Sequence, residues 1–147
     1  MNMEDVVIKM REFNRFYTNI ISVLDQSVLN SGYSLAEARV LYEIGRIQPC
    51  SARRLMESIN IDEGYLSRIL NVFAKRGFLV RIQSEEDKRI YEITLSEKGI
   101  LQLDNLNAIA NQSNKKLIEK LTVSQLADLI KSMKTISKVL TQHNHVN

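Results

Sequence analysis

Residues 51–99 read SARRLMESINIDEGYLSRILNVFAKRGFLVRIQSEEDKRIYEITLSEKG, and this stretch decides the fold. It opens with two apolar patterns of helical period, separated by a short polar turn, and Ser51 and Asp62 stand where each helix needs an N-terminal cap. The second pattern ends at Gly77, a residue typical of a left-handed C-terminal cap. After it, FLVRIQ and IYEITL are rich in β-branched and aromatic residues and flank the polar SEEDKR, so the sequence predicts a β-hairpin.

Helical patterns continue on both sides of this stretch. Ser34 and Glu37 form a capping box that opens a short helix, which we expect to end near Gly45. Residues 4–30 carry an apolar stripe at steps of three and four, and a second stripe makes this long helix apolar on more than one side. Such a helix presents more apolar surface than a small domain can cover, so we expect it to pack on another chain.

Two further helices are expected after the hairpin. Ser96 opens a long helical stretch, and either Thr122 or Ser124 caps a last helix that runs to Leu140. The closing residues HNHVN are expected to fray.

The composition fits one mainly α-helical domain with a small β-hairpin wing. The chain has 147 residues, 44% of them hydrophobic, with one proline and five glycines, too few turn residues for a many-stranded β fold. A formal net charge of +3 means that any basic surface must be local. Apolar runs are too short to span a membrane and the N-terminus carries carboxylates, so we expect a cytoplasmic protein with no membrane partner.

The expected helix that begins after Asp62 has two distinct faces. On a helical wheel, four apolar residues turn inward: Leu66, Ile69, Leu70 and Phe73. The outward face is polar and locally basic, and it comprises Gly64, Arg68, Asn71 and Lys75, flanked by Tyr65 and Ser67. A short helix, a tight turn, a second helix with such a face and then a hairpin is the order of a winged helix-turn-helix, whose second helix enters the DNA major groove. The alternative is an ordinary solvated helix face.

The hairpin tip and the start of the preceding helix add candidate DNA contacts. Asp87 stands beside Lys88 and Arg89, and a carboxylate can fix the direction of a guanidinium that enters a minor groove. The alternative for this tip is an ordinary charged turn. Arg53 and Arg54 lie close to the Ser51 cap and can touch phosphates. The predicted DNA-contacting set is therefore Ser51, Arg53, Arg54, Gly64, Tyr65, Ser67, Arg68, Asn71, Lys75, Asp87, Lys88 and Arg89.

Three segments together carry a family resemblance. They are SLAEARVLYEI, SARRLMESINIDEGYLSRILNVFAKRGFLVR and DKRIYEITLSEKG, and they resemble the MarR family of winged helix-turn-helix transcriptional regulators. The most specific match is Asp87-Lys88-Arg89 followed by the strand that closes in LSEKG, where Ser96 replaces the commoner threonine.

The resemblance implies a homodimeric regulator, a repressor, that binds pseudo-palindromic double-stranded DNA and is released by a small-molecule ligand. It implies a winged helix-turn-helix DNA-binding lobe at residues 34–95 and a helical dimerisation region at residues 1–33 and 96–147. By position, Ser67 and Arg68 fall where the family reads bases and Arg89 falls at its wing arginine.

Two alternatives to a free-standing regulator stay open. DEGYLSRIL at residues 62–70 is most similar to the MarR-type domain that some proteins carry ahead of a GNAT acetyltransferase, so the chain is either a separate regulator of that subgroup or a regulatory fragment. The other alternative is a winged helix used only for protein–protein assembly, which predicts no binding to any duplex at any salt concentration.

No enzyme, metal site or cofactor is expected. His143 and His145 have ligand-like spacing but no carboxylate or cysteine partner, and Cys50 has no histidine near it. Cys50 is expected to be buried and structural, the alternative being a redox thiol whose pKa is lowered by the following helix N-terminus. Aromatic residues can line a ligand crevice or serve as interface; these candidates are Phe13, Phe16, Tyr17 and Tyr42.

Overall fold

The computed structural model describes residues 2–143, which form six helices and one β-hairpin. In chain order the elements are α1 (Met3–Leu29), α2 (Leu35–Ile47), α3 (Ala52–Ile59), α4 (Glu63–Lys75), β1 (Leu79–Gln83), β2 (Tyr91–Leu95), α5 (Glu97–Ile118) and α6 (Val123–His143). The predicted class, mainly helical with a small hairpin wing, is confirmed.

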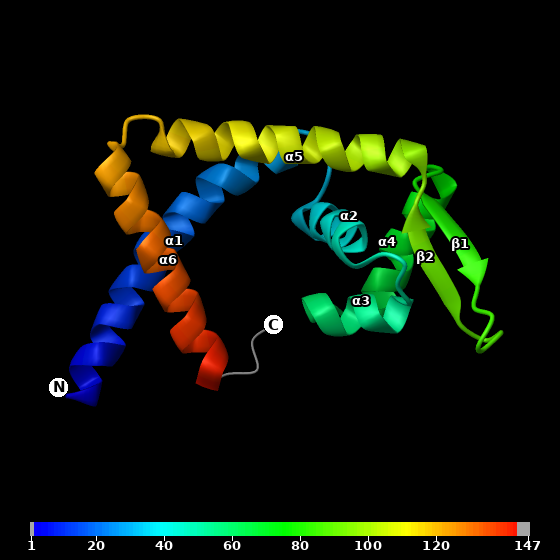
Figure 1. Ribbon diagram of the computed structural model, residues 1–147, viewed down its shortest axis with the longest axis horizontal. Helices are drawn as coiled ribbons and strands as arrows, with labels where there is room; N and C mark the ends of the chain where they lie inside the picture. Colours follow the sequence, from blue (N-terminus) through cyan, green and yellow to red (C-terminus); the bar gives the residue numbers. More distant parts are fainter. Residues whose placement is uncertain (1, 144–147) are drawn as a thin grey trace.

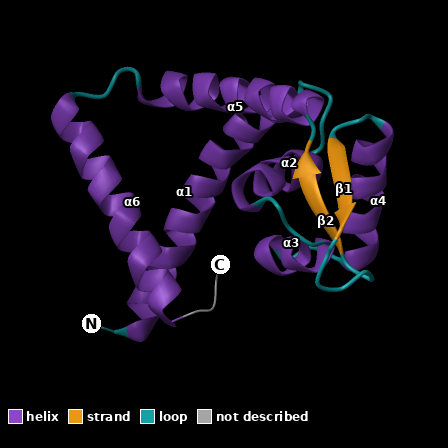
Figure 2. Ribbon diagram, turned by 45° about the vertical axis from the view of Figure 1, so that its right-hand side comes forward, coloured by secondary structure: helices purple, strands orange, loops and turns teal. Residues whose placement is uncertain are grey.

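Helix α5 runs across the top of the molecule in Figure 1, and the other elements lie below it. One end adjoins the hairpin, α1 packs along its middle, and α6 descends from the other end. The smaller elements α2, α3, α4 and the hairpin gather beneath the hairpin end of α5, as the turned view also shows (Figure 2). The fold therefore consists of a winged lobe, defined here as residues 34–95, and long helices that extend away from it.

Side-chain caps fix where most helices begin. At α2 the full capping box is present: the Ser34 side chain accepts from the Glu37 amide, and the Glu37 carboxylate accepts from the Ser34 amide. Ser51 and Asp62 cap α3 and α4 by accepting amide protons three residues on, and these predictions are confirmed.

Two glycines at expected helix ends behave differently. Gly77 follows α4 with a φ of 74°, the left-handed geometry that was predicted. Helix α2, predicted to end near Gly45, ends two residues later at Ile47, so Gly45 lies in its last turn and is not a cap. An added Cβ at Gly45 would collide with the Leu103 side chain, so this glycine lets α5 approach α2 closely.

The apolar core lies inside the winged lobe and under α5. Its buried members are Val40, Leu41, Ile44, Cys50, Leu55, Ile59, Leu66, Ile69, Leu70, Phe73, Phe78, Ile93, Leu95 and Leu106. The four residues predicted to turn inward from α4 are all among them. The helix-turn-helix is therefore held by packing against α2, the hairpin and α5.

The hairpin is antiparallel, with Leu79 opposite Leu95 and Gln83 opposite Tyr91. An isolated antiparallel bridge links the hairpin to the residue just before the α3 cap. In this bridge, Cys50 and Ile93 exchange backbone hydrogen bonds of 3.1 and 2.8 Å. The Gln48 side chain adds to this joint by accepting from the Leu95 amide at 2.8 Å. These contacts fix the wing relative to the helix-turn-helix.

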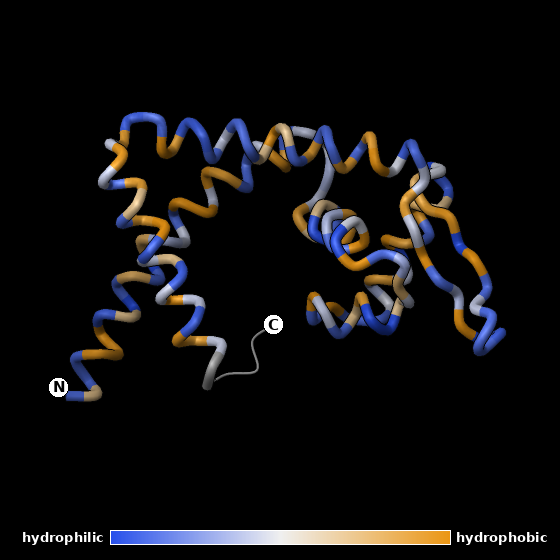
Figure 3. The backbone as a smooth tube through the Cα atoms, viewed as in Figure 1, coloured by the Kyte–Doolittle hydropathy of each residue, from blue (hydrophilic) through white to orange (hydrophobic). Residues whose placement is uncertain are grey.

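The long helices α1 and α6 bury little. No residue of α1 is buried, and α6 is exposed along almost all of its described side chains. Apolar segments recur along both helices (Figure 3), and Val23, Met133 and Val139 keep 72%, 49% and 54% of their surface exposed. Such surface is typical of helices that pack against another molecule.

The end of the chain differs slightly from expectation. Of the two candidate caps for the last helix, Thr122 is the one that forms the capping hydrogen bond. Its Oγ1 atom accepts from the Gln125 backbone amide at 3.3 Å. Helix α6 includes His143, which was expected to fray with the tail, while residues 144–147 and with them His145 lie outside the described residues. Across the described chain, no helix combines the length and hydropathy that a membrane crossing requires.

Candidate nucleic-acid interface

The outward face of α4 is solvent-exposed along its length. Gly64, Ser67, Arg68, Asn71 and Lys75 are all exposed, as predicted. Because the opposite face is locked into the core, the helix presents these side chains on a rigid support. The face is polar, and its cations are Arg68 and Lys75.

Tyr65 and Arg68 form a local pair on this face. The Arg68 guanidinium carbon lies 5.5 Å from the centre of the Tyr65 ring, a cation–π arrangement, and Tyr65 keeps 40% of its surface exposed. The ring restricts the arginine, yet the guanidinium remains open to a ligand. An arginine held in this way loses less conformational freedom when it binds a base edge or a phosphate.

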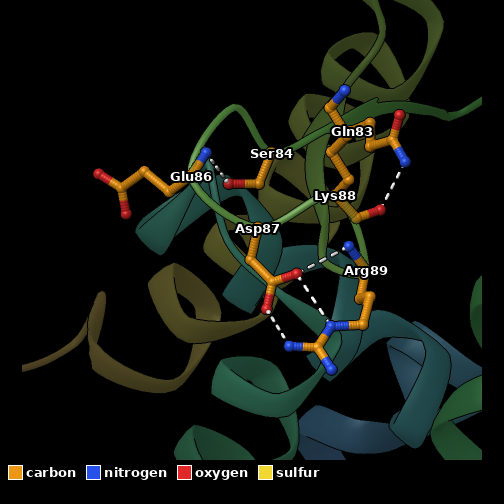
Figure 4. A network of polar contacts seen from close by, with 6 residues as sticks. All are labelled: Gln83, Ser84, Glu86, Asp87, Lys88 and Arg89. Carbon is orange, nitrogen blue, oxygen red and sulfur yellow. Dashed lines mark hydrogen bonds and ion pairs between the residues drawn. The ribbon is translucent and has the colours of Figure 1, made fainter.

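At the hairpin tip, Asp87 holds Arg89. Its carboxylate accepts from the Arg89 amide at 3.0 Å and from the Nε atom at 3.2 Å, with a longer contact of 3.4 Å to the terminal nitrogen (Figure 4). The Arg89 backbone bond, followed by its side-chain bond, lowers the pKa of Asp87 below its ordinary value. The Arg89 side chain is 92% exposed, so the arginine is oriented but still accessible. The predicted pairing of these two residues is confirmed.

The first turn of α3 provides two more arginines. Ser51 accepts from the Arg54 amide at 3.2 Å, and both Arg53 and Arg54 are exposed. The Arg53 Nε atom donates to Glu57 at 3.0 Å, one turn further along. Arg53 is thus partly compensated within its own helix.

A groove of about 680 Å³ lies between α3, α4 and the hairpin. It brings together five of the predicted residues, namely Ser51, Arg53, Ser67, Asn71 and Arg89. It is also lined by Arg81 and Tyr91, which the sequence reasoning missed, and by the acidic Glu63. Strand alternation could have identified Arg81 and Tyr91 from the sequence. Successive residues of a strand point to opposite faces, and both residues lie on the hairpin face that carries the buried Ile93. The other predicted contacts, Arg54, Gly64, Tyr65, Arg68, Lys75, Asp87 and Lys88, are not among the residues that line the groove.

Behind this surface, a polar cluster joins α2 to α3. Glu43 is only 6% exposed, and its carboxylate accepts from Arg46 Nε at 3.1 Å, from the Arg46 terminal nitrogen at 2.6 Å and from the Ser58 hydroxyl. The Arg46 hydrogen bond is the main reason that the pKa of Glu43 is lowered, and burial opposes it. The cluster fixes α3 against α2, and a link between residues fifteen positions apart was not foreseen from the sequence.

The candidate ligand aromatics lie on two elements. Phe13 and Tyr17 stack with ring centres 5.7 Å apart on α1, and Phe16 lines a second groove of about 500 Å³ between α1 and α5. Tyr42 lies on α2 and is 54% exposed.

The remaining chemistry-bearing residues form no reactive cluster. Cys50 is 3% exposed, as expected for a structural thiol, and burial raises its pKa, against the alternative of a thiol activated by the helix N-terminus. Among the side chains that the structure describes, no three from His, Cys, Asp or Glu gather closely enough to hold a metal ion.

Comparisons with known proteins show what the helix-turn-helix region is similar to. Residues 31–90 match the model of the MarR family. The transcriptional regulator BilQ of Clostridium symbiosum is 27% identical over 112 residues, which cover 76% of this chain and 78% of that protein. SarZ, a transcriptional regulator of Staphylococcus haemolyticus, is 29% identical over 99 residues, covering 66% of this chain and 65% of SarZ.

Solved structures agree on the fold. Streptococcus pneumoniae FabT in complex with DNA has a TM-score of 0.76 at 19% identity, covering 92% of this chain and 99% of that chain. The apo form of MarR from E. coli has a TM-score of 0.74 at 21% identity, covering 86% and 93%. The arrangement of α1 to α6 and the hairpin is therefore that of MarR winged-helix proteins.

Proposed function

Because residues 31–90 match the model of the MarR family and residues 34–95 form a winged helix-turn-helix, we infer that this chain is a DNA-binding transcriptional regulator. The observation that carries the inference is geometric: the exposed face of α4, the first turn of α3 and the oriented Arg89 all border one groove or adjoin it. A helix with such a face enters a major groove while the hairpin tip reaches the neighbouring minor groove. The names of the relatives support this reading, since BilQ and SarZ are transcriptional regulators and FabT is seen with DNA.

In the proposed complex the contacts divide into two classes. Ser67, Arg68 and Asn71 read base edges from α4, because arginine and asparagine can form paired hydrogen bonds with guanine and adenine. The others position the duplex through its backbone or its minor groove; these are Ser51, Arg53, Arg54, Gly64, Tyr65, Lys75, Asp87, Lys88 and Arg89. Asp87 acts through Arg89, whose direction it sets.

We propose that the active species is a homodimer. The winged lobe at residues 34–95 contacts DNA, while residues 1–33 and 96–147 form the helical dimerisation region, whose apolar α1 and α6 faces are exposed in a single chain. A two-fold dimer places two copies of α4 about one helical turn apart, which matches a pseudo-palindromic site. The regulator acts as a cytoplasmic repressor, without catalytic activity of its own, and a small ligand in the crevice beside Phe16 releases the DNA.

A salt-dependent gel shift tests the proposal. The probe is a duplex selected by the wild-type protein from a random pool, compared with an unselected duplex. Affinity is expected to fall steeply with salt, since the contacts include phosphates. Arg68→Ala is expected to cost about 1–3 kcal/mol on the selected duplex and much less on the unselected one, as base reading requires.

The matched control is Lys134→Ala, which removes one exposed cation from α6, away from the winged lobe. It is expected to leave both duplexes bound as by the wild type. Absence of binding to every duplex at every salt concentration would reject the regulator and favour a protein-assembly module. Equal weakening on both duplexes would leave Arg68 as a phosphate contact only.

A further inference from the structure

The groove between α3, α4 and the hairpin has a specific occupant in the proposed complex. We propose that one sugar–phosphate strand of the duplex lies in this groove, and that Arg81 and Tyr91 on the hairpin bind its phosphates. This inference rests on the proposed function and deepens it, because it assigns a backbone-binding site to residues outside the recognition helix and the wing tip.

The position of the groove leads to this occupant. It lies between α4, which is proposed to enter a major groove, and Arg89 at the tip, which is proposed to enter the adjacent minor groove. In duplex DNA, a major groove and its neighbouring minor groove are separated by one sugar–phosphate backbone. A duplex read by both elements must therefore place that backbone between them, over the groove.

The charges in the groove favour a polyanion. Arginines enter it from three elements: Arg53 from α3, Arg81 from β1 and Arg89 from the tip. Arg53 is paired with Glu57 and Arg89 with Asp87.

Arg81 differs from these two arginines. In the described part of the chain, no carboxylate oxygen lies within 4.0 Å of its guanidinium. Glu63 is the one carboxylate among the groove-lining residues, so the lining is positive overall. Arg81 therefore offers the groove an uncompensated positive charge, and a phosphate is the group in DNA that supplies its partner.

The strand register places a second phosphate ligand beside it. Arg81 lies opposite Ile93, and Tyr91 is two residues before Ile93 on the same face, so Arg81 and Tyr91 are diagonal neighbours. Tyr91 is 53% exposed, and a phenol hydroxyl can donate to a phosphate oxygen. Ile93 is buried against the core, so the rigid part of the hairpin carries both side chains.

Arg81→Ala and Tyr91→Phe test the site in the full chain, on the duplex selected by the wild type. Arg81→Ala is expected to weaken binding roughly tenfold at about 0.1 M salt, and to reduce the slope of log K against log salt by about 0.9 per subunit. Arg81→Lys keeps the charge and is expected to restore the slope. Tyr91→Phe is expected to bind two- to fivefold more weakly with an unchanged slope, since it removes about one hydrogen bond and no charge.

Lys120→Ala provides the matched charge control. Lys120 lies in the exposed turn between α5 and α6, at the end of α5 that is far from the hairpin, and its loss is expected to change neither affinity nor slope (Figure 1). Thermal melting of every variant separates weaker binding from unfolding.

Single methylphosphonate substitutions in the duplex locate the contact. Where the neutral group replaces the phosphate that Arg81 binds, the wild type is expected to lose affinity and Arg81→Ala is expected to lose none. The site would be overturned if folded Arg81→Ala kept the salt slope of the wild type. It would also be overturned if every methylphosphonate weakened both proteins equally. Either result would leave DNA binding by the chain intact. Failure of the wild type to bind any duplex would instead overturn the proposed function.

Discussion

The winged lobe and the two helices α1 and α6 both carry apolar sequence, but they bury it very differently. In the lobe, Val40, Leu41 and Phe73 have no exposed surface at all. In α1 and α6, Val23 and Val123 keep 72% and 85% of theirs. The winged lobe buries its apolar side chains within a single chain, whereas α1 and α6 leave theirs exposed.

This difference indicates that the winged lobe and the two helices α1 and α6 have different roles. A lobe whose core is closed by α5 can present α4 and the hairpin tip as a rigid surface without burying α6 or most of α1. Exposed apolar faces that run along whole helices are stable in water only when another surface covers them, and in the proposed dimer that surface is a second copy.

The largest expected effect comes from charging Ile20 and Leu24, two apolar residues of α1 that line the groove between α1 and α5. Ile20→Asp with Leu24→Asp is expected to turn the proposed dimer into monomers, or to unfold the chain, because two carboxylates would be placed in the apolar packing beside α5 on which the proposed interface rests. Sedimentation equilibrium gives the mass, and circular dichroism gives the melting temperature.

Thr18→Asp with Ser22→Asp is the matched control. It has the same spacing and the same added charge, but it lies on the opposite side of the helix, where both hydroxyls donate only to backbone carbonyls one turn earlier. The control should behave as the wild type. If Ile20→Asp with Leu24→Asp also keeps the wild-type mass and melting temperature, the contrast between the two regions has another explanation.

The next effect concerns the junction between the winged lobe and α5. An added Cβ at Gly99 would collide with the backbone carbonyl of Phe78, which cannot rotate away because it accepts from the Ser96 amide at 2.8 Å. Gly99→Ala is therefore expected to destabilise the protein by about 1–3 kcal/mol in urea denaturation.

Gly64→Ala provides the comparison, at the start of another helix. The nearest atom to an added Cβ there is Asp62 Oδ1 at 3.3 Å, and alanine favours helix over glycine by up to about 1 kcal/mol. Gly64→Ala should therefore keep or raise the stability of the free protein, and weaken DNA binding if the backbone approaches the duplex closely. Equal stability for the two variants would show that the Phe78 junction tolerates more movement than its geometry implies.

Local interactions account for what the sequence predicted well. Ser34, Ser51 and Asp62 bond to amides three residues away, and Asp87 bonds to Arg89 two residues away, so the partners are visible in a short window. The inward residues of α4 follow from helical periodicity alone. The winged helix-turn-helix and most of its candidate surface were therefore predictable.

Contacts between distant segments account for the rest. Gly45 has the appearance of a helix end, but its role depends on Leu103 from α5. Ser58 reaches Glu43 across two helices, and Arg81 joins the groove only because the hairpin folds back beside α3 and α4. Periodicity gives the face of an element but not which other element covers it, so these residues could not be placed in advance.

Acid is expected to weaken the winged lobe through Glu43. The pKa of Glu43 is lowered in the folded chain, so its contribution to stability is complete above the ordinary carboxyl pKa of about 4.3 and is lost as pH falls through the lower folded value. Glu43→Gln cannot titrate at this position. The stability difference between the wild type and Glu43→Gln, measured by urea denaturation, should therefore shrink as pH falls. A difference that is constant from neutral to acidic pH would contradict the proposed role of this carboxylate.

The smallest effect tests whether Asp87 orients Arg89 in the DNA complex as it does in the free chain. Arg89→Ala is expected to weaken binding and to lower the salt slope by about one unit per subunit, because one charge near the phosphates is lost. Asp87→Ala removes an acid from the same tip, and on charge alone it should strengthen binding.

If Asp87 positions Arg89 through the contacts of 3.0 and 3.2 Å, the loss of orientation offsets that gain, and Asp87→Ala should bind equally or more weakly. The double variant should then be no weaker than Arg89→Ala, because an orienting residue has nothing left to orient. Lys88→Ala removes a neighbouring charge that Asp87 does not hold, so its effect should be the same with Asp87 or alanine at position 87. The orienting role would be contradicted if Asp87→Ala bound DNA several-fold more tightly and the effects were additive in the double variant. The tip would then be an ordinary charged turn, and the contact between Asp87 and Arg89 would have no role in DNA binding.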